Sequence, residues 1–170
     1  MDKIAVMNEA RARYRLRHDI EIKHQAETLF KRYKDEPLFV AGIMLYWAEG
    51  TRLPAIATNR KYQLALTNSN PELVELYCKF LRRYFGNVEP NIRGALFIYS
   101  DIDDSGAKSF WSSRLKISLS QFIKTQILPS RRMPGKKKLP YGICCVYLNS
   151  KDYCYIMESW INNISNYMRG

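Results

Sequence analysis

The chain carries at residues 38–50 the stretch LFVAGIMLYWAEG, an almost uninterrupted apolar run that ends in an acid and a glycine. Its apolar character and the small residues Ala41 and Gly42 predict a buried helix that can approach another helix closely. Gly50 predicts the end of this helix, because glycine readily adopts the left-handed conformation found at many helix C-termini. Glu49 would then lie at the negative end of the helix dipole, where a carboxylate is unfavourable unless a cation compensates its charge. We therefore expect Glu49 to bind a metal ion.

Outward from this helix, helical and strand patterns follow one another, which predicts a mixed α+β fold. Residues 2–35 have sparse apolar positions and precede Pro37, so we expect one long polar helix there. Alternating apolar and polar residues predict strands at 61–68 and 91–100, with Gln63 and Arg93 facing outward. The other expected elements are a helix capped at Ser69-Asn70-Pro71, a short helix at 108–115, strands at 120–128 and 141–149, and a final helix at 152–168.

The basic excess of the chain is concentrated in one region. The 170 residues include 27 Lys and Arg against 16 Asp and Glu, for a net charge of +11. Residues 51–138 alone hold 16 basic and 6 acidic side chains, including the run RRMPGKKK at 131–138, whereas residues 1–36 hold 9 against 7. A basic excess in the body of a folded domain predicts binding to a phosphate backbone. Membrane-surface proteins usually add an amphipathic basic helix or a lipidation signal, and neither is evident here.

Length, composition and cysteine usage narrow the class of protein. A chain of 170 residues suffices for one domain, and an aromatic content of 13% argues against disorder. The apolar run at 38–48 is too short to cross a bilayer, so we expect no membrane partner. The four cysteines show no C-x-x-C spacing, which predicts reduced, buried thiols in a cytoplasmic protein rather than a zinc site.

At Ala48-Glu49-Gly50 the sequence resembles the LAGLIDADG homing-endonuclease family, whose helix carries small packing residues followed by a metal-binding acid and a glycine. Glu stands here where the family has Asp, and Met44 occupies the position of the family's close-packing glycine. The resemblance implies a single αββαββα domain over residues 37–170, with a curved antiparallel sheet whose first strand would come from Arg52–Thr58. Residues 1–36 would form an additional N-terminal helix outside this core.

The resemblance also implies how such a site would work. Family members with one motif act as homodimers whose motif helices pack across a two-fold axis, and the contact residues here would be Ala41, Gly42, Leu45 and Ala48. The two Glu49 carboxylates would then hold Mg²⁺ (or Mn²⁺), which activates water for phosphodiester hydrolysis. A basic residue near the scissile phosphate is also implied. Lys138, Lys137 and Arg52 are the candidates, and no spacing selects one of them.

The outward faces of the strands would lie in the major groove of double-stranded DNA, which is wide enough for a β-ribbon. The residues expected to contact nucleic acid are Arg52, Arg60, Lys61, Gln63, Arg93, Lys124, Gln126, Arg131, Arg132, Lys136, Lys137 and Lys138. The last three can equally form a solvated loop, and Tyr46 and Trp47 are expected in the core or at a dimer contact. Two other functions stay open: a DNA-binding regulator that does not cleave, and an RNA-binding or intron-splicing accessory protein.

Overall fold

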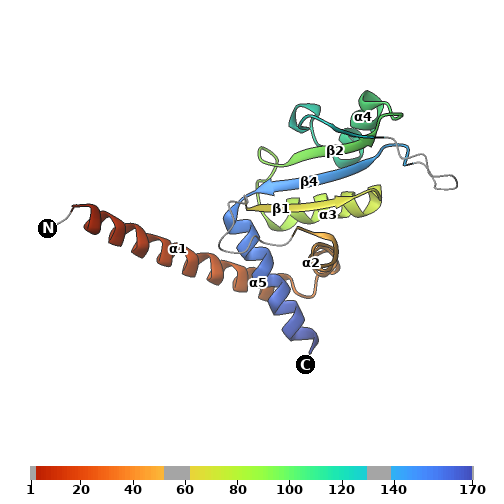
Figure 1. Cartoon of the computed structure of the whole chain (residues 1–170). Helices are drawn as coiled ribbons and strands as arrows, with labels where there is room; N and C mark the ends of the chain where they lie inside the picture. The colour runs from red at the N-terminus through yellow and green to blue at the C-terminus, as the bar shows by residue number, and fades with distance from the viewer. Residues whose placement is uncertain (1–2, 52–61, 130–138, 170) are drawn as a thin grey trace.

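The computed structural model describes residues 3–51, 62–129 and 139–169. Helices and strands alternate along these ranges, as the sequence predicts (Figure 1). The elements are α1 (Lys3–Tyr33), α2 (Pro37–Glu49), β1 (Gln63–Asn68), α3 (Pro71–Tyr84), β2 (Arg93–Tyr99), α4 (Asp104–Leu115), the 3-10 turn η1 (Leu119–Gln121), β3 (Gln126–Leu128), β4 (Ile143–Asn149) and α5 (Lys151–Met168). The mixed α+β class is therefore confirmed.

The described strands form one mixed sheet in the order β1-β4-β2-β3. β4 pairs antiparallel with both β1 and β2, whereas β3 runs parallel to β2. The expectation of an antiparallel sheet is therefore wrong at this edge. The physical reason is the connection, because α4 carries the chain back between β2 and β3, and a parallel pair requires such a crossover.

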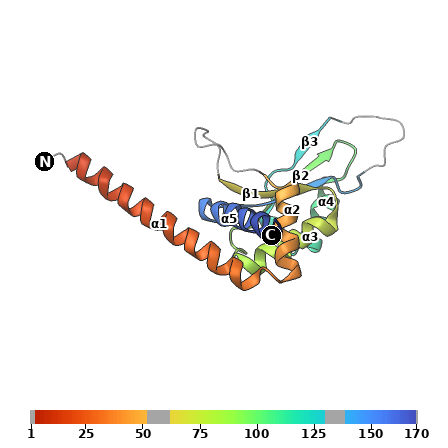
Figure 2. The same cartoon turned by 90° about the horizontal axis from the view of Figure 1, so that it is seen from below.

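The helices cover one face of the sheet and leave the other face without a helix (Figure 2). Leu64, Leu96 and Val146 point from three neighbouring strands into the main core, where each is fully buried. The alternate residues of the same strands form a second, smaller cluster on the opposite face: Ala65, Ala95, Cys145 and Tyr147, with Phe97 packed against them. The predicted period of two in β1 and β2 is thus confirmed, and it separates the two faces of the sheet.

The inner side of α2 packs against α3 and α5 through aromatic rings. Phe39 is fully buried and contacts Phe80, Tyr84 and Trp160, with ring centroids 4.9 Å apart for Tyr84 and 4.8 Å apart for Trp160. Gly42 lies directly against Phe80, so that a Cβ atom at this position would overlap the phenyl side chain. The predicted close approach of another helix is therefore made within the chain, by α3.

α1 is attached to the body by its C-terminal half only, and its N-terminal half projects away from the other elements (Figures 1 and 2). Ala26 and Phe30 are its buried residues. The indole Nε1 of Trp160 donates a hydrogen bond of 2.9 Å to the Ala26 carbonyl, which fixes α1 against α5. At the outer limit of this contact, Lys151 pairs with Asp19 at 3.7 Å and His18 Nε2 lies 3.4 Å from Asp152. The long N-terminal helix is thus confirmed, with ends one or two residues inside the expected ones.

The four cysteines are free thiols buried in the fold, as predicted. Burial raises the pKa of both Cys78 and Cys154 to about 12, and it also raises those of Cys144 and Cys145. These thiols are therefore protonated at neutral pH. Within the described ranges, no helix combines the length and the hydrophobicity that crossing a lipid bilayer requires.

Candidate nucleic-acid interface and metal site

Glu49 is the last residue of α2, and its side chain is exposed. Among the residues that the structure describes, none forms a hydrogen bond or an ion pair with its carboxylate. The described part of one chain also contains no group of three His, Cys, Asp or Glu residues able to hold a metal ion. One chain therefore offers Glu49 as a single accessible oxygen ligand at a helix end, and further ligands would have to come from a second chain, from solvent or from a bound phosphate.

The chain turns sharply after Glu49 and joins the edge of the sheet. The Gly50 amide donates to the Tyr46 carbonyl at 2.7 Å, and the Thr51 amide donates to the Ala65 carbonyl at 2.9 Å. The predicted left-handed conformation of Gly50 is wrong, because its φ of −78° and ψ of 162° are those of extended backbone. Glycine is needed here for space, since a Cβ atom would overlap the ring and the carbonyl oxygen of Tyr46. This contact places Glu49 beside β1.

The Tyr46 hydroxyl fixes the same turn from inside. It donates a hydrogen bond to the carbonyl of Thr51, the residue that begins the approach to the sheet. Burial raises the pKa of Tyr46 well above its usual value, and the neighbouring Cys154 and Glu158 raise it further. The hydroxyl therefore stays protonated and able to donate. Tyr46 is a core residue, as expected, and it positions the helix end that carries Glu49.

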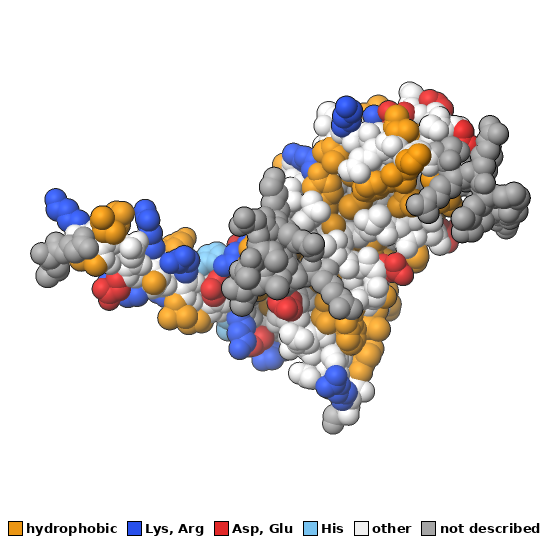
Figure 3. All heavy atoms as spheres, in the orientation of Figure 1, with side chains coloured by type: hydrophobic (Ala, Val, Ile, Leu, Met, Phe, Trp, Pro, Cys, Tyr) orange, Lys and Arg blue, Asp and Glu red, His pale blue; other side chains and the backbone are white. Residues whose placement is uncertain are grey.

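The outer side of α2 is an exposed apolar surface, which we call the α2 face. Its central residues are Pro37, Ala41, Met44 and Ala48, all exposed and spaced three or four residues apart, so they lie on one side of the helix. Trp47 is 47% exposed beside them, and Leu45 is half-buried at the margin. In Figure 3 hydrophobic side chains gather where α2 lies, at the lower right of the molecule.

Three of the four residues predicted for helix–helix contact between subunits, Ala41, Leu45 and Ala48, thus lie on or beside the α2 face. Gly42 does not, because it is buried on the opposite side against Phe80. Successive helix residues are separated by about 100° around the axis, so neighbours such as Ala41 and Gly42 cannot both face one partner helix. The assignment of Gly42 to an intersubunit contact is corrected accordingly.

The sheet surface opposite the helices, which we call the open face because no helix covers it (Figure 2), has polar side chains around a buried centre formed by Ala65, Ala95, Cys145 and Tyr147. The described strands contain no Asp or Glu. Gln63 and Thr67 of β1, Asn149 of β4, Arg93 of β2 and Gln126 of β3 share this face by their register. Amide side chains and arginine are the groups that form bidentate hydrogen bonds with base edges in the major groove.

Gln63 and Arg93 are brought together near one end of this face. Gln63 pairs with Asn149 and donates a side-chain hydrogen bond of 3.2 Å to its Oδ1. Arg93 pairs with Tyr147 on the other edge of β4, so the two predicted residues lie about 12 Å apart, two strand spacings across the sheet and two residues along it. The Arg93 Nη1 donates to the carbonyls of Pro90 and Ile92, both at 2.9 Å, which holds the guanidinium at the start of β2.

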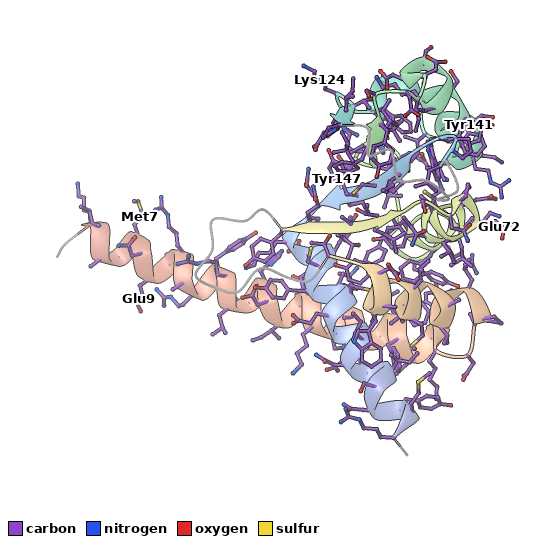
Figure 4. All side chains as sticks on the ribbon, turned by 45° about the vertical axis from the view of Figure 1, so that its right-hand side comes forward. Met7, Glu9, Glu72, Lys124, Tyr141 and Tyr147 are labelled. Atoms are coloured by element: carbon purple, nitrogen blue, oxygen red, sulfur yellow. The ribbon has the colours of Figure 1, made fainter. Side chains whose placement is uncertain are left out.

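Tyr147 lies between these two positions and is labelled in Figure 4, where it points away from α3. Burial raises the pKa of its hydroxyl, and the nearby Arg93 partly offsets this effect. The sequence analysis does not predict Tyr147 or Asn149 as site residues, because β-forming residues alone indicate the strand at 141–149. The signal that could have found them is the alternation Cys145, Tyr147, Asn149, which places these residues on one face.

Lys124 and Gln126 are both exposed, but only Gln126 belongs to a strand. Their segment is positioned by Thr125, whose hydroxyl donates a hydrogen bond of 2.5 Å to Asp104 at the start of α4. This bond, followed by one from Lys108, lowers the pKa of Asp104. The predicted shared strand face of Lys124 and Gln126 is therefore wrong, although Figure 4 shows Lys124 directed to the same side of the molecule as Tyr147.

Eight of the predicted basic residues lie outside the described ranges: Arg52, Arg60, Lys61, Arg131, Arg132, Lys136, Lys137 and Lys138. The expected strand within 52–58 lies outside them as well. By sequence, segments 52–61 and 130–138 together hold eight basic side chains and no acid. Segment 52–61 connects α2 to β1, and segment 130–138 connects β3 to β4.

Comparisons of the chain with models of known protein families, with curated proteins and with solved structures found no match in any of the three. Fold alone does not determine function, which follows from the chemistry of particular side chains. The α2 face with Glu49 and the open face of the sheet are therefore the two features that bear on function.

Proposed function

We propose that this chain is a DNA-binding protein that works as a homodimeric, divalent-metal-dependent DNA endonuclease of the LAGLIDADG type. The observation that carries the proposal is the position of Glu49, an exposed carboxylate without a described partner at the end of an exposed apolar helix face. A two-fold axis along the α2 face would bury Met44 and Trp47 and would bring the C-terminal ends of two α2 helices together. The two Glu49 carboxylates would project from these ends, each about 100° around its helix from Ala48. Their like charges would repel unless a cation lay between them.

The order of elements supports the finer fold that belongs to this proposal. In this proposal α2 would be the first helix of an αββαββα core, α3 the central helix and α5 the last. β1 and β4 would be the second and fourth strands, and segment 52–58 would supply the first. α4, η1 and β3 would then be an insertion between the third and fourth strands, in the place of a direct hairpin.

The Glu49 carboxylate is a ligand of the type that hard divalent cations prefer. Mg²⁺ and Mn²⁺ prefer oxygen ligands and usually bind through one or two carboxylates, with water and phosphate completing the shell. Glu49 supplies one such oxygen donor for each chain, and a bound ion would polarise the scissile phosphate and lower the pKa of attacking water. The chain's own contribution is positional, since the Tyr46 and Gly50 contacts hold Glu49 beside the edge of β1.

DNA binding rests on charge and on the composition of the open face. The described strands carry no acid, and the two segments that flank them contribute eight basic residues by sequence. Arg93, Gln63 and Gln126 offer donors and acceptors to base edges. Lys124 and the basic segments would contact phosphates, and a basic residue such as Lys138 would assist at the scissile phosphate. These phosphate contacts would make binding strongly dependent on salt.

One observation favours a second candidate function, a DNA-binding regulator that does not cleave. Within the described ranges no further carboxylate, histidine or cysteine joins Glu49 in a three-residue metal group. Cleavage therefore depends on dimerisation through the α2 face, whereas binding through the open face does not.

The decisive experiment compares Glu49→Gln with the wild type in cleavage of a plasmid library in Mg²⁺ or Mn²⁺, alongside DNA binding. Glutamine keeps the size of the side chain and removes its charge, so we expect cleavage to be lost and binding to remain. Glu72→Gln is the matched control, because Glu72 is an exposed helical acid on the opposite side of the sheet from Tyr147 (Figure 4). Wild-type cleavage by Glu49→Gln would exclude Glu49 from the chemistry.

Binding and subunit association have tests of their own. Replacing Lys136, Lys137 and Lys138 with Glu should weaken binding to all duplex sequences about equally and should flatten its salt dependence. Unchanged binding would identify this segment as a solvated loop. Sedimentation as a monomer at micromolar concentration, with and without DNA, would contradict the dimer.

A further inference from the structure

The projecting half of α1 differs in charge from the half that packs on α5. Every residue from Lys3 to Arg17 is exposed. This outer half holds five basic residues and one acid: Lys3, Arg11, Arg13, Arg15 and Arg17 against Glu9. From Asp19 to Tyr33, three basic residues balance three acids. The basic excess of α1 is thus confined to the part that makes no contact with the core.

The four arginines form two pairs on different sides of the helix. Arg11 and Arg15 are four residues apart and lie on one side, and Arg13 and Arg17 form an equivalent pair. At about 100° per residue, the two pairs are separated by about 160° around the axis. The surface between them, over the shorter arc, consists of Lys3, Met7, Ala10 and Tyr14. We call this surface, with the two flanking arginine pairs, the α1 basic face.

The arginines are largely free to meet an external partner. Arg13 lies 3.9 Å from Glu9, a loose ion pair in which both side chains are about two-thirds exposed. Within the described ranges no carboxylate pairs with Arg11, Arg15 or Arg17. Exposed arginines spaced along a helix match an array of phosphates better than they match a protein core.

The apolar residues of the outer half do not form a seam for another helix. Ile4, Val6, Met7, Tyr14 and Leu16 are 46–65% exposed, and they are spread around the helix, with Ile4, Val6 and Leu16 on three different sides. A coiled coil or a membrane-surface helix requires these residues on one stripe. A second copy of this basic segment would also repel the first. Charge complementarity therefore selects an anionic partner.

The α1 basic face is turned toward the side of the molecule that carries the open face of the sheet. In Figure 4 Met7 lies on the upper side of α1, toward the level of Tyr147 and Lys124, whereas Glu9 points down and away from them. In Figure 3 basic side chains line the upper edge of the projecting helix. α1 and the open face thus form two arms of an L.

We propose that the outer half of α1 lies in the major groove of B-form DNA, with its two arginine pairs on the phosphates of opposite strands. This inference rests on the proposed DNA binding and extends it to an element outside the sheet. The major groove is about 12 Å wide and admits one α-helix, whose own diameter with side chains is about 10–12 Å. Fifteen residues span about 22 Å, so the arm would add roughly six base pairs to the bound site.

The test measures salt-dependent binding of the full chain to a duplex DNA of mixed sequence and to the RNA duplex of the same sequence. The variant carries Arg11→Gln, Arg13→Gln, Arg15→Gln and Arg17→Gln. Four lost phosphate contacts should reduce the salt slope on DNA by about 3.6 and the affinity on the order of 10²–10³-fold. The effect on RNA should be much smaller, because the narrow major groove of A-form RNA excludes a helix.

The matched control removes four charges from the inner part of the same region: Lys23→Gln, Lys31→Gln, Arg32→Gln and Lys34→Gln. For this control, the slope of log affinity for DNA against log salt concentration should stay near that of the wild type. A benzophenone side chain in place of Met7 should crosslink to DNA on irradiation, and the same group in place of Ala12, on the other side of the helix, should not. Both sites are exposed, so folding should be unaffected.

The outcomes separate this inference from the proposed function. Three results would overturn the groove-bound arm. They are an equal loss of DNA affinity in the outer and inner variants, an equal loss of affinity for DNA and RNA in the outer variant, or equal crosslinking from positions 7 and 12. If Arg93→Gln with Lys124→Gln weakens DNA binding while the arm variant does not, the arm is refuted and the sheet interface stands. A wild type that binds neither duplex refutes both.

Discussion

Replacing Gly42 with Val tests the orientation of α2 in the fold. The structure places Gly42 against the Cβ, Cγ and ring of Phe80, so the added methyl groups would overlap atoms close to the α3 backbone. Phe80 is fully buried and contacts the rings of Phe39, Tyr84 and Trp160, which prevents it from moving aside. Overpacking of this kind costs about 1–3 kcal/mol.

The higher helix propensity of valine offsets only a small part of this loss. Valine is a better helix former than glycine by about 0.3–0.5 kcal/mol, so the net loss of unfolding free energy for Gly42→Val should be about 0.5–2.7 kcal/mol. For a chain of this length the melting temperature should fall by roughly 2–10 °C. The assay is urea unfolding at a protein concentration at which sedimentation shows only monomer, so that subunit association does not contribute.

The control is Ala41→Val, one residue away on the exposed α2 face. It introduces the same side chain into the same helix without a buried neighbour, so it should cost about 0.5 kcal/mol of unfolding free energy. A wild-type stability for Gly42→Val together with a loss above about 2 kcal/mol for Ala41→Val would refute the reasoning. It would mean that α2 is rotated in solution and that Ala41 faces the core.

Three further predictions concern the α2 face and pH. Met44→Asp should weaken dimerisation at least about tenfold in sedimentation, whereas the same change at exposed Leu119 should not, because only Met44 lies on the α2 face. Hydrogen bonds from Thr125 and Lys108 lower the pKa of Asp104. The ionised carboxylate therefore stabilises the fold above about pH 4, and this stabilisation is lost as the pH falls further. Faster hydrogen exchange near β3 at low pH should reveal the loss. Burial and the hydrogen bond to Glu36 raise the pKa of Tyr84 to about 12. The protonated hydroxyl therefore contributes to the free energy of unfolding below about pH 10, and this contribution is lost toward pH 12, as urea midpoints measured across this range should show.

Local patterns predicted the elements whose structure is set by local contacts. The cap at Asn70 is an example, because its side chain accepts a hydrogen bond of 2.9 Å from the Glu72 amide two residues later. Strand β1 is another, since the alternation of Leu64 and Leu66 with Ala65 directly determines which side of the sheet each residue faces. Such signals lie within a few consecutive residues.

The failures have a common physical cause, which is contact between segments distant in sequence. The expected strand at 120–128 is shortened because its first part is held in the turn η1, where Gln121 Nε2 donates to the Glu89 and Ile92 carbonyls. Its middle bonds to Asp104 through Thr125. Likewise, the sequence identified Gly42 as a close-packing residue but could not say which helix it approaches. The pairing of Arg93 with Tyr147 also depends on strand order, which no local pattern contains.

The reactivity of the buried cysteines would report how often different parts of this fold unfold locally. Only a thiolate attacks a labelling reagent, and Cys78, Cys144 and Cys154 are both shielded from solvent and held protonated by their high pKa values. They lie in α3, β4 and α5, so the order in which they become reactive would rank these elements by how often each separates from the rest. Rapid labelling of Cys154 alone would identify α5, the anchor of α1, as the first part of the fold to open.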